Sequence, residues 1–394
     1  MKSSAKHSEK KKKKNRSYFY RFCAWLHLWL GLISGIVVVV VSLTAAILTF
    51  EEEIKLLTEP FQTVEYAESA EFLSPSILSE AVKEELGFPS VYGVYYRGEG
   101  RSAMVPYYAD RTNYQEIYVN PYTAEILHNR RLNNDFWRSM IIGHYQLWLP
   151  RNIGKPIVAY STLMFVIALI TGLVLWWPKR WNKSTRDASF KIKWTAKFKR
   201  LNYDLHNVLG FYSLLVALVL GLTGMVYGMQ WFSDAVYWTA SGGEIRTQNL
   251  PGSDTTAVAQ YDKRQEDVLF EQVLDSGIDP ARNRVGIQYP SGKTGVWNVN
   301  INPSFETRWQ ALSTYYEKGS LKELKKDQKF SEANGGEQLM KLNYDLHVGA
   351  IGGIWTKIIA FLVCVISASL PVTGFIVWWK KSAGKRSKAL KFPT

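Results

Sequence analysis

The chain has 394 residues, of which 47% are hydrophobic and 14% aromatic, and this composition excludes a disordered or collagen-like protein. Its net charge of +14 at pH 7 is compatible with a nucleic-acid-binding protein or with a membrane protein. The positions of the charges along the chain distinguish these two classes. Residues 1–22, 178–200 and 380–394 hold 24 of the 48 lysines and arginines but only two acids, whereas the remainder holds 24 basic residues against 32 acids. Such clustering is typical of a membrane protein and argues against a nucleic-acid partner.

Four stretches contain no Asp, Glu, Lys or Arg and are long enough to cross a bilayer. They are residues 22–50, 156–178, 205–233 and 358–379, with lengths of 29, 23, 29 and 22 residues. A hydrocarbon core about 30 Å thick needs roughly 20 apolar residues in a helix. We therefore expect four transmembrane helices in a lipid bilayer, at residues 23–50, 141–178 with an entry from outside, 204–230 and 342–379.

The basic segments predict the orientation of these helices. Cytoplasmic segments of membrane proteins are enriched in lysine and arginine. The tail 1–22, the loop 179–203 and the tail 380–394 should therefore face the cytoplasm, and the loops 51–140 and 231–341 should lie outside. The lysine run near the start resembles a signal peptide, but the apolar segment after it is too long for one, so we expect a retained anchor.

Both outer loops are long enough for a small α+β domain. In the first, "SPSILSEAVKEELG" predicts a helix that ends at Gly87, followed by strands in "SVYGVYYR", "SAMVPYYAD" and "YQEIYVNPYTAEIL", the last turning at Asn120–Pro121. The second has a similar order, with a helix in "QEDVLFEQVLDSG" and strands in "NRVGIQYP", "GVWNVNIN" and "TRWQALSTYY".

The first and second halves of the chain share a pattern of residue spacings. Two histidine-to-threonine spacings of 17 residues and two lysine-to-threonine spacings of 16 recur in the same order: His27 to Thr44, His206 to Thr223, Lys155 to Thr171 and Lys357 to Thr373. Two spans per half preserve orientation, so the halves should be related by a pseudo-two-fold axis along the membrane normal. The string LNYDLH occurs at 201–206 and 342–347, and Asp204 and Asp345 in it are expected to cap helices.

Four of the six histidines belong to this pattern. The pseudo-two-fold axis would place His27 opposite His206 near the cytoplasmic face and His144 opposite His347 near the outer face. Two facing imidazoles from different helices are the arrangement that ligates a haem iron in a bundle. We therefore interpret the four histidines as candidate axial ligands at two depths; His7 and His128 are assigned no role.

The same residues are compatible with other roles. A zinc site needs three or four ligands at one depth, and the two levels are too far apart to share a metal. The alternative use of the histidines is a hydrogen bond to a neighbouring helix. Thr-Gly pairs at 171–172, 223–224 and 373–374 are typical of close helix packing, although they could leave room for a macrocycle. Trp pairs at 176–177 and 378–379 suggest an aromatic belt, and Arg151, Lys155 and Lys357 suggest either snorkelling anchors or partners of haem propionates.

Several segments resemble one known family. "LHLWLGLISGIVVVVVSLTAAILTF", "YVNPYTAEIL", "HYQLWLPRNIGKPIV", "DLHNVLGFY" and "LHVGAIGG" are similar to the PepSY-associated transmembrane proteins. The resemblance covers nearly the whole chain after residue 20, and Ala124 stands where the family usually has glycine. It implies a four-helix membrane core of two pseudo-symmetric halves, with two PepSY-like domains outside the membrane.

The resemblance also implies a function. Members include bacterial inner-membrane ferric-siderophore reductases that bind two b-type haems and reduce chelated iron on the periplasmic side. By motif, His27, His144, His206 and His347 carry over as haem ligands, and the acceptor would be a ferric siderophore or another ferric chelate. The chain has no G-x-G-x-x-G fingerprint, so the electron donor should be separate, a quinol or a flavoprotein. The alternative is a sensory membrane protein without enzymatic activity whose PepSY domains bind peptides or proteases and whose histidines are structural.

Overall fold

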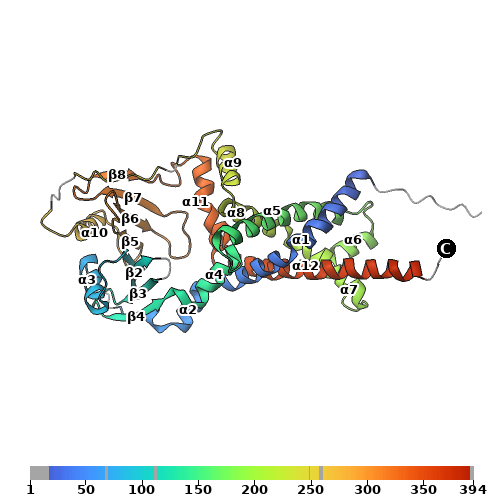
Figure 1. Cartoon of the computed structure of the whole chain (residues 1–394), viewed down its shortest axis with the longest axis horizontal. Coiled ribbons are helices and arrows are strands. Elements are labelled where there is room, and N and C mark those ends of the chain that lie inside the picture. Colours follow the sequence, from blue (N-terminus) through green and yellow to red (C-terminus); the bar gives the residue numbers. More distant parts are fainter. Residues whose placement is uncertain (1–16, 67–69, 111–112, 248, 257–260, 391–394) are drawn as a thin grey trace, which may run out of the picture.

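The protein consists of a helical bundle and a helix-covered β-sheet joined end to end (Figure 1). The computed structural model describes residues 17–66, 70–110, 113–247, 249–256 and 261–390. In that part of the chain, four helical segments are long and apolar enough to cross a membrane: Tyr18–Leu48, Arg151–Trp176, Phe198–Gly228 and Ala350–Lys380. The number of spans and their approximate positions are those that the charge-free stretches predict, and a membrane-embedded protein follows from them.

The bundle is formed by α1 (Tyr18–Leu48), α5 (Arg151–Trp176), α8 (Gly210–Gly228) and α12 (Gly353–Leu390). Helix α1 packs against α5 and α12, and α8 packs against the same two helices. The third span is continuous from α7 (Phe198–Asp204) through a π-helical turn, η3 (Leu205–Leu209), into α8. A π-turn adds one residue to a helical turn and is common at functional sites, and here it contains His206.

Short helices join the spans to the sheet at one end of the bundle, which we call the sheet end. These are α2 (Glu51–Thr58), η1 (Pro60–Gln62), η2 (Leu132–Asn134), α4 (Phe136–Gln146), α9 (Gln230–Ala240), α11 (Gly335–His347) and η4 (Ala350–Gly352). The opposite end, called the far end, carries α6 (Lys183–Phe190) and α7 (Figure 1).

Eight antiparallel strands form one sheet in the order β4-β3-β2-β1-β5-β6-β7-β8. The strands are β1 (Gly93–Tyr96), β2 (Ala103–Asp110), β3 (Asn113–Val119), β4 (Ile126–Arg131), β5 (Arg284–Gln288), β6 (Val296–Asn302), β7 (Leu312–Glu317) and β8 (Glu323–Lys326). The first four come from the loop after α1 and the last four from the loop after α8. They join through β1 and β5, where Val94 pairs with Ile287 and Tyr96 with Val285. The two outer loops therefore share a single sheet.

The core of the sheet lies on the face covered by α3 (Pro75–Leu86) and α10 (Gln265–Asp275). Tyr96 is buried there and stacks on Phe270 with ring centres 4.7 Å apart. The predicted helix ends as expected, because Gly87 takes the left-handed conformation at the C-cap, with φ of 68°. Ala124, in the turn between β3 and β4, also has a positive φ of 64°, which explains why glycine would suit this position. The sequence analysis missed β8.

Two histidine pairs as a candidate metal centre

The four bundle histidines lie in two facing pairs. The ring centres of His27 and His206 are 6.2 Å apart, and those of His144 and His347 are 6.0 Å apart. His27 comes from α1 and His206 from the π-turn, whereas His144 and His347 come from the last turns of α4 and α11. We call the first two the far-side pair and the last two the sheet-side pair. This is the pairing that the repeat predicts; ligation by these residues stays a prediction.

Each imidazole points its Nδ1 atom at a threonine hydroxyl on a neighbouring helix. The Nδ1 to Oγ1 distances are 3.4 Å for His27 and Thr171, 3.3 Å for His144 and Thr44, 3.0 Å for His206 and Thr373, and 3.0 Å for His347 and Thr223. All four threonines donate their own hydroxyl proton to the carbonyl four residues earlier in their helix. The hydroxyl oxygen can therefore only accept from the ring, so Nδ1 carries the proton.

Backbone carbonyls support the same tautomer. Nδ1 of His27 lies 2.9 Å from the carbonyl oxygen of Ala168, and Nδ1 of His144 lies 3.0 Å from that of Val41. A carbonyl oxygen only accepts, so both rings must donate from Nδ1. The second ring nitrogen, Nε2, keeps a free lone pair, as a metal-ligating histidine with an oriented second nitrogen does.

The spacing of each pair suits one metal ion between the rings. With metal–nitrogen bonds of about 2.0 Å, two ligating nitrogens on opposite sides of an ion lie about 4 Å apart, and their ring centres roughly 6 Å apart. The observed ring-centre distances of 6.2 and 6.0 Å agree with that value. In the described part of the chain, no group of three or more His, Cys, Asp or Glu side chains could hold a metal.

The glycine after three of the four threonines makes room for a histidine. A Cβ atom placed on Gly172 would lie 3.1 Å from Cε1 of His27. The corresponding distances are 3.2 Å from Gly224 to His347 and 3.0 Å from Gly374 to His206. These contacts are tighter than ordinary van der Waals packing. The Thr-Gly pairs, interpreted from the sequence as helix-packing motifs, thus seat and orient the imidazoles.

In the repeated string LNYDLH, the asparagine as well as the histidine contacts a neighbouring helix. Asn202 and His206 lie one turn apart, and the Asn202 side-chain amide donates to the carbonyl of Thr373 at 3.0 Å. Asn343 makes the same bond to the carbonyl of Thr223, at 3.3 Å. Both asparagines are buried. The sequence analysis missed these asparagines, although their spacing of four residues from each histidine was a usable signal.

The expectation that Asp204 and Asp345 cap their own helices is wrong. The N-cap residues are Lys197 for α7 and Asn334 for α11, and both aspartates lie further along the helices. Asp345 accepts from the backbone N–H groups of Arg308 and Trp309 at 2.8 to 2.9 Å.

Asp204 has a similar role at the other end of the bundle. It pairs with Arg200 at 2.8 Å and accepts from the backbone of Lys193 at 3.3 Å. The two carboxylates are fully buried and tie loops to the helices that carry the histidines. The backbone groups that they bind, those of Lys193, Arg308 and Trp309, lie outside these helices, so no local capping pattern could reveal them.

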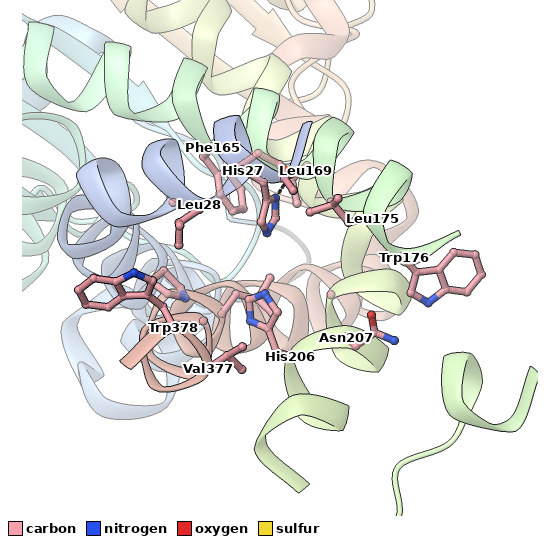
Figure 2. A pocket seen from close by; sticks show the side chains of 18 of the residues that line it. His27, Leu28, Phe165, Leu169, Leu175, Trp176, His206, Asn207, Val377 and Trp378 are labelled. Atoms are coloured by element: carbon pink, nitrogen blue, oxygen red, sulfur yellow. Dashed lines mark hydrogen bonds between the residues drawn. The ribbon is translucent and has the colours of Figure 1, made fainter. Parts of the chain in front are cut away.

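A cavity surrounds each histidine pair. The far-side cavity has a volume of about 400 Å³ and the sheet-side cavity about 480 Å³, both within the usual range for small-molecule and cofactor sites. Figure 2 shows His27 and His206 facing each other across the far-side cavity, with Phe165 and Leu169 beside His27. Trp176, predicted in an aromatic belt, is buried in its wall and stacks on Phe211 with ring centres 3.8 Å apart.

The two cavities differ in charge. Arg151 and Lys155, one turn apart on α5, line the sheet-side cavity together with Tyr145 and Tyr227. The lining of the far-side cavity contains no Lys, Arg, Asp or Glu within the described residues. Lys357, the third cation near the sheet-side pair, instead contacts Glu53 at 2.5 Å. Only Arg151 and Lys155 are therefore placed to meet carboxylates of a ligand in the cavity.

Of the two remaining histidines, the structure describes His128, which lines neither cavity. His128 on β4 stacks on Phe61 with ring centres 4.0 Å apart. His7 lies outside the described residues, as does most of the predicted basic tail.

The sequence of the bundle and of the sheet together matches the PepSY-associated TM region family over residues 24–381. This chain is a member of that family. A comparison with curated proteins gave no match. The family match covers both histidine pairs and the eight strands of the sheet.

Proposed function

We propose that this PepSY-associated membrane protein binds two b-type haems, one between the histidines of each pair, and moves electrons across the bacterial cytoplasmic membrane. The observation that carries the proposal is the spacing of 6.2 and 6.0 Å between the paired rings, with every Nδ1 engaged and every Nε2 free. A bound haem supplies a one-electron couple at its iron. The basic tails and basic loop would face the cytoplasm, and the sheet would face the periplasm.

The chain's own residues account for holding and orienting such groups. The four threonines fix the imidazole orientation, and the glycines beside them let the rings approach the neighbouring helix. Arg151 and Lys155 would bind propionate carboxylates on the sheet side. Val38 and Phe165 line both cavities, so the two sites share a wall within the bundle.

The repetition of these contacts supports the two pseudo-symmetric halves. In each half, the first-span histidine bonds the threonine of the second span: His27 with Thr171, and His206 with Thr373. In each half, the histidine at the sheet end bonds the threonine of the first span: His144 with Thr44, and His347 with Thr223. One arrangement used twice would place the two sites at two depths and create a path from one face of the membrane to the other.

The proposed reaction is the reduction of a ferric chelate, most plausibly a ferric siderophore, at the sheet end. One electron converts Fe³⁺ to Fe²⁺, and hard oxygen ligands bind the doubly charged ion less tightly, so the metal is released. The electron comes from a separate quinol or flavoprotein. Tyr145 and Arg151 line the sheet-side cavity, and Trp148 packs against Gly143 beside His144. These three residues are candidates for contact with the acceptor.

A pyridine-haemochrome assay on the purified full-length protein tests the proposal. Two b-type haems per chain are expected, and the chemically reduced protein should be reoxidised by a ferric siderophore while a ferrous-iron trap develops colour. A colourless protein expressed with ample haem would instead favour the sensory or peptide-binding alternative. If the protein is coloured but no ferric chelate reoxidises it, haem binding is supported and the assignment as a ferric-chelate reductase is contradicted.

A further inference from the structure

Three arginines gather where the two halves of the sheet meet. Tyr96 pairs with Val285 across β1 and β5, so the next residues outward, Arg97 and Arg284, stand opposite each other. Because Tyr96 and Val285 point into the core under α3 and α10, Arg97 and Arg284 point to the other face of the sheet. Arg101, at the start of the next strand region, is close enough to interact electrostatically with Arg97 and Arg284.

This group of cations has little negative charge to balance it. Glu52 on α2 bonds Arg284 at 2.6 Å and is the carboxylate that acts on all three arginines. Like charges directly opposite each other on neighbouring strands are destabilising. Burial, together with the repulsion from Arg284 and Arg101, holds the pKa of Arg97 below its usual value.

The three guanidinium groups also have nitrogens without partners. Nη1 of Arg97, Nη1 of Arg101 and Nε of Arg284 are buried and make no hydrogen bond to the described residues. A buried donor that loses water without gaining a partner is costly, and charged donors cost most. Three such atoms in one place point to an acceptor beyond the described residues.

Arg130, on the same face of the sheet, provides the contrast. It lies among three carboxylates, pairing with Glu59 and reaching Asp135 at 3.9 Å and Glu116 at 4.0 Å. Nη1 of Arg130 also lacks a hydrogen bond to the described residues, but a carboxylate lies 4.0 Å away, so its charge is balanced within the network. The cluster of Arg97, Arg101 and Arg284 is open instead, because the side chains of Arg284 and Glu52 at its rim are 30% and 45% exposed.

We propose that Arg97, Arg101 and Arg284 form a binding site for a small polycarboxylate, taken up either free or as its ferric complex. Guanidinium groups present a planar fork of donors that matches carboxylate oxygens in pairs, which a lysine cluster would not. The ligand would bond the guanidinium groups and separate the opposed charges of Arg97 and Arg284. This site requires no haem and therefore stands apart from the proposed electron transfer.

The position of the cluster relates it to the sheet-side pair. Glu52 belongs to α2, which follows α1 at the sheet end, and it acts electrostatically on Tyr344 of α11. Tyr344 precedes His347 by three residues, less than one helical turn. A ferric polycarboxylate held by the arginines would thus lie on the side of the sheet that faces the sheet-side cavity.

The test uses the full-length protein in detergent, with citrate, ferric dicitrate and a neutral ferric trihydroxamate as probes. Citrate or its ferric complex should raise the melting temperature in a concentration-dependent way, and the hydroxamate should not. Arg97→Gln and Arg284→Gln should weaken binding about tenfold or more in calorimetry, the loss of at least one charge-assisted bond. Arg282→Gln is the matched control, because that side chain is 87% exposed and two residues away.

Stability without ligand separates a binding role from a structural one. Removing Arg97 relieves repulsion, so Arg97→Gln without ligand should melt at or above the wild-type temperature, whereas a structural arginine would lower it. Equal binding of citrate and ferric dicitrate identifies a free polycarboxylate, and tighter binding of the ferric form identifies the chelate. No binding to the wild type, or equal binding to wild type and Arg97→Gln, overturns the site. Haem absorbance of the same samples reports on the haem proposal independently.

Discussion

The Nδ1 atom of His206 lies 3.0 Å from the hydroxyl of Thr373, and Asn202 reaches the carbonyl of the same threonine. One threonine therefore fixes both ends of a helical turn on the neighbouring span. His347 and Asn343 hold Thr223 in the same way. In both copies of LNYDLH, the asparagine and the histidine thus bind the threonine of a Thr-Gly pair on another helix. This contact holds Nδ1 of the imidazole and leaves Nε2 available to a ligand.

Replacing Thr373 should loosen His206, which we propose as a haem ligand. Thr373→Val keeps the shape of the side chain but removes the acceptor, so His206 loses its orientation, and haem affinity at the far-side site should fall about 10- to 100-fold. Haem transfer to an apo-globin measures the loss, and Thr373→Ser should restore affinity. Thr239→Val is the control, because Thr239 makes the same bond to the carbonyl four residues earlier but is exposed on α9. Equal haem loss from both variants would contradict the role of Thr373.

Single replacements of the histidines should fall into two classes. His27→Ala and His206→Ala should both abolish or change the far-side haem spectrum, and His144→Ala and His347→Ala should both affect the sheet-side spectrum. Two replacements within a pair should add little, because the paired ligands act as a unit. Low-temperature absorbance and electron paramagnetic resonance separate the two components. Perturbation of one and the same component by His27→Ala and His144→Ala would disprove the two-site arrangement.

A methyl group at Gly374 should displace one ligand only. The Cβ of Gly374→Ala would lie 3.0 Å from Cε1 of His206, so the ring must move and the far-side spectrum should shift. Gly224→Ala should do the same to the sheet-side spectrum, because its Cβ would lie 3.2 Å from Cε1 of His347. Each variant serves as the control for the other. Loss of both components from either single variant would show a general packing defect.

The charge difference between the cavities predicts different reduction potentials. Arg151 and Lys155 favour an added electron in the sheet-side cavity, whereas no described residue in the far-side lining is a cation. A haem bound on the sheet side should therefore have the higher potential. The double variant Arg151→Gln, Lys155→Gln should lower that potential by tens of millivolts, on the order of 1 kcal/mol. A spectroscopic redox titration measures both components, and the unchanged far-side potential is the internal control. A sheet-side potential that stays constant would contradict this account.

The junction of the two half-sheets should be sensitive to size at Gly286. A Cβ there would lie 2.7 Å from the ring of Tyr95, which faces it across β1 and β5. Gly286→Ala should therefore lower the free energy of unfolding by about 1–3 kcal/mol through overpacking. Gly252→Ala is the control, since its nearest neighbours would be at 3.7 Å. Thermal unfolding followed by intrinsic fluorescence compares the two, and equal melting temperatures would contradict the tight packing at the junction.

The sequence by itself determined the four spans, the order of most helices and strands outside them, and the identity of the paired histidines. Span positions follow from local composition, because a bilayer rejects charge along some 20 consecutive residues. Pairing of His27 with His206 and of His144 with His347 followed from repeated spacings, and the ring distances agree with it. Periodicity also sufficed for the helix at Pro75–Leu86, which ends at a glycine.

The contacts between segments that are far apart in sequence were decided only by the tertiary structure. Strands β1 and β5 are nearly 190 residues apart in sequence, and no local pattern indicates that they pair to make one sheet. The backbone groups bound by Asp204, Asp345, Asn202 and Asn343 likewise lie on other segments, so these polar roles could not be assigned from helix periodicity. The unpartnered donors of Arg97 and Arg284 exist because strand pairing brings like charges together, and burial then removes the water that would have solvated them.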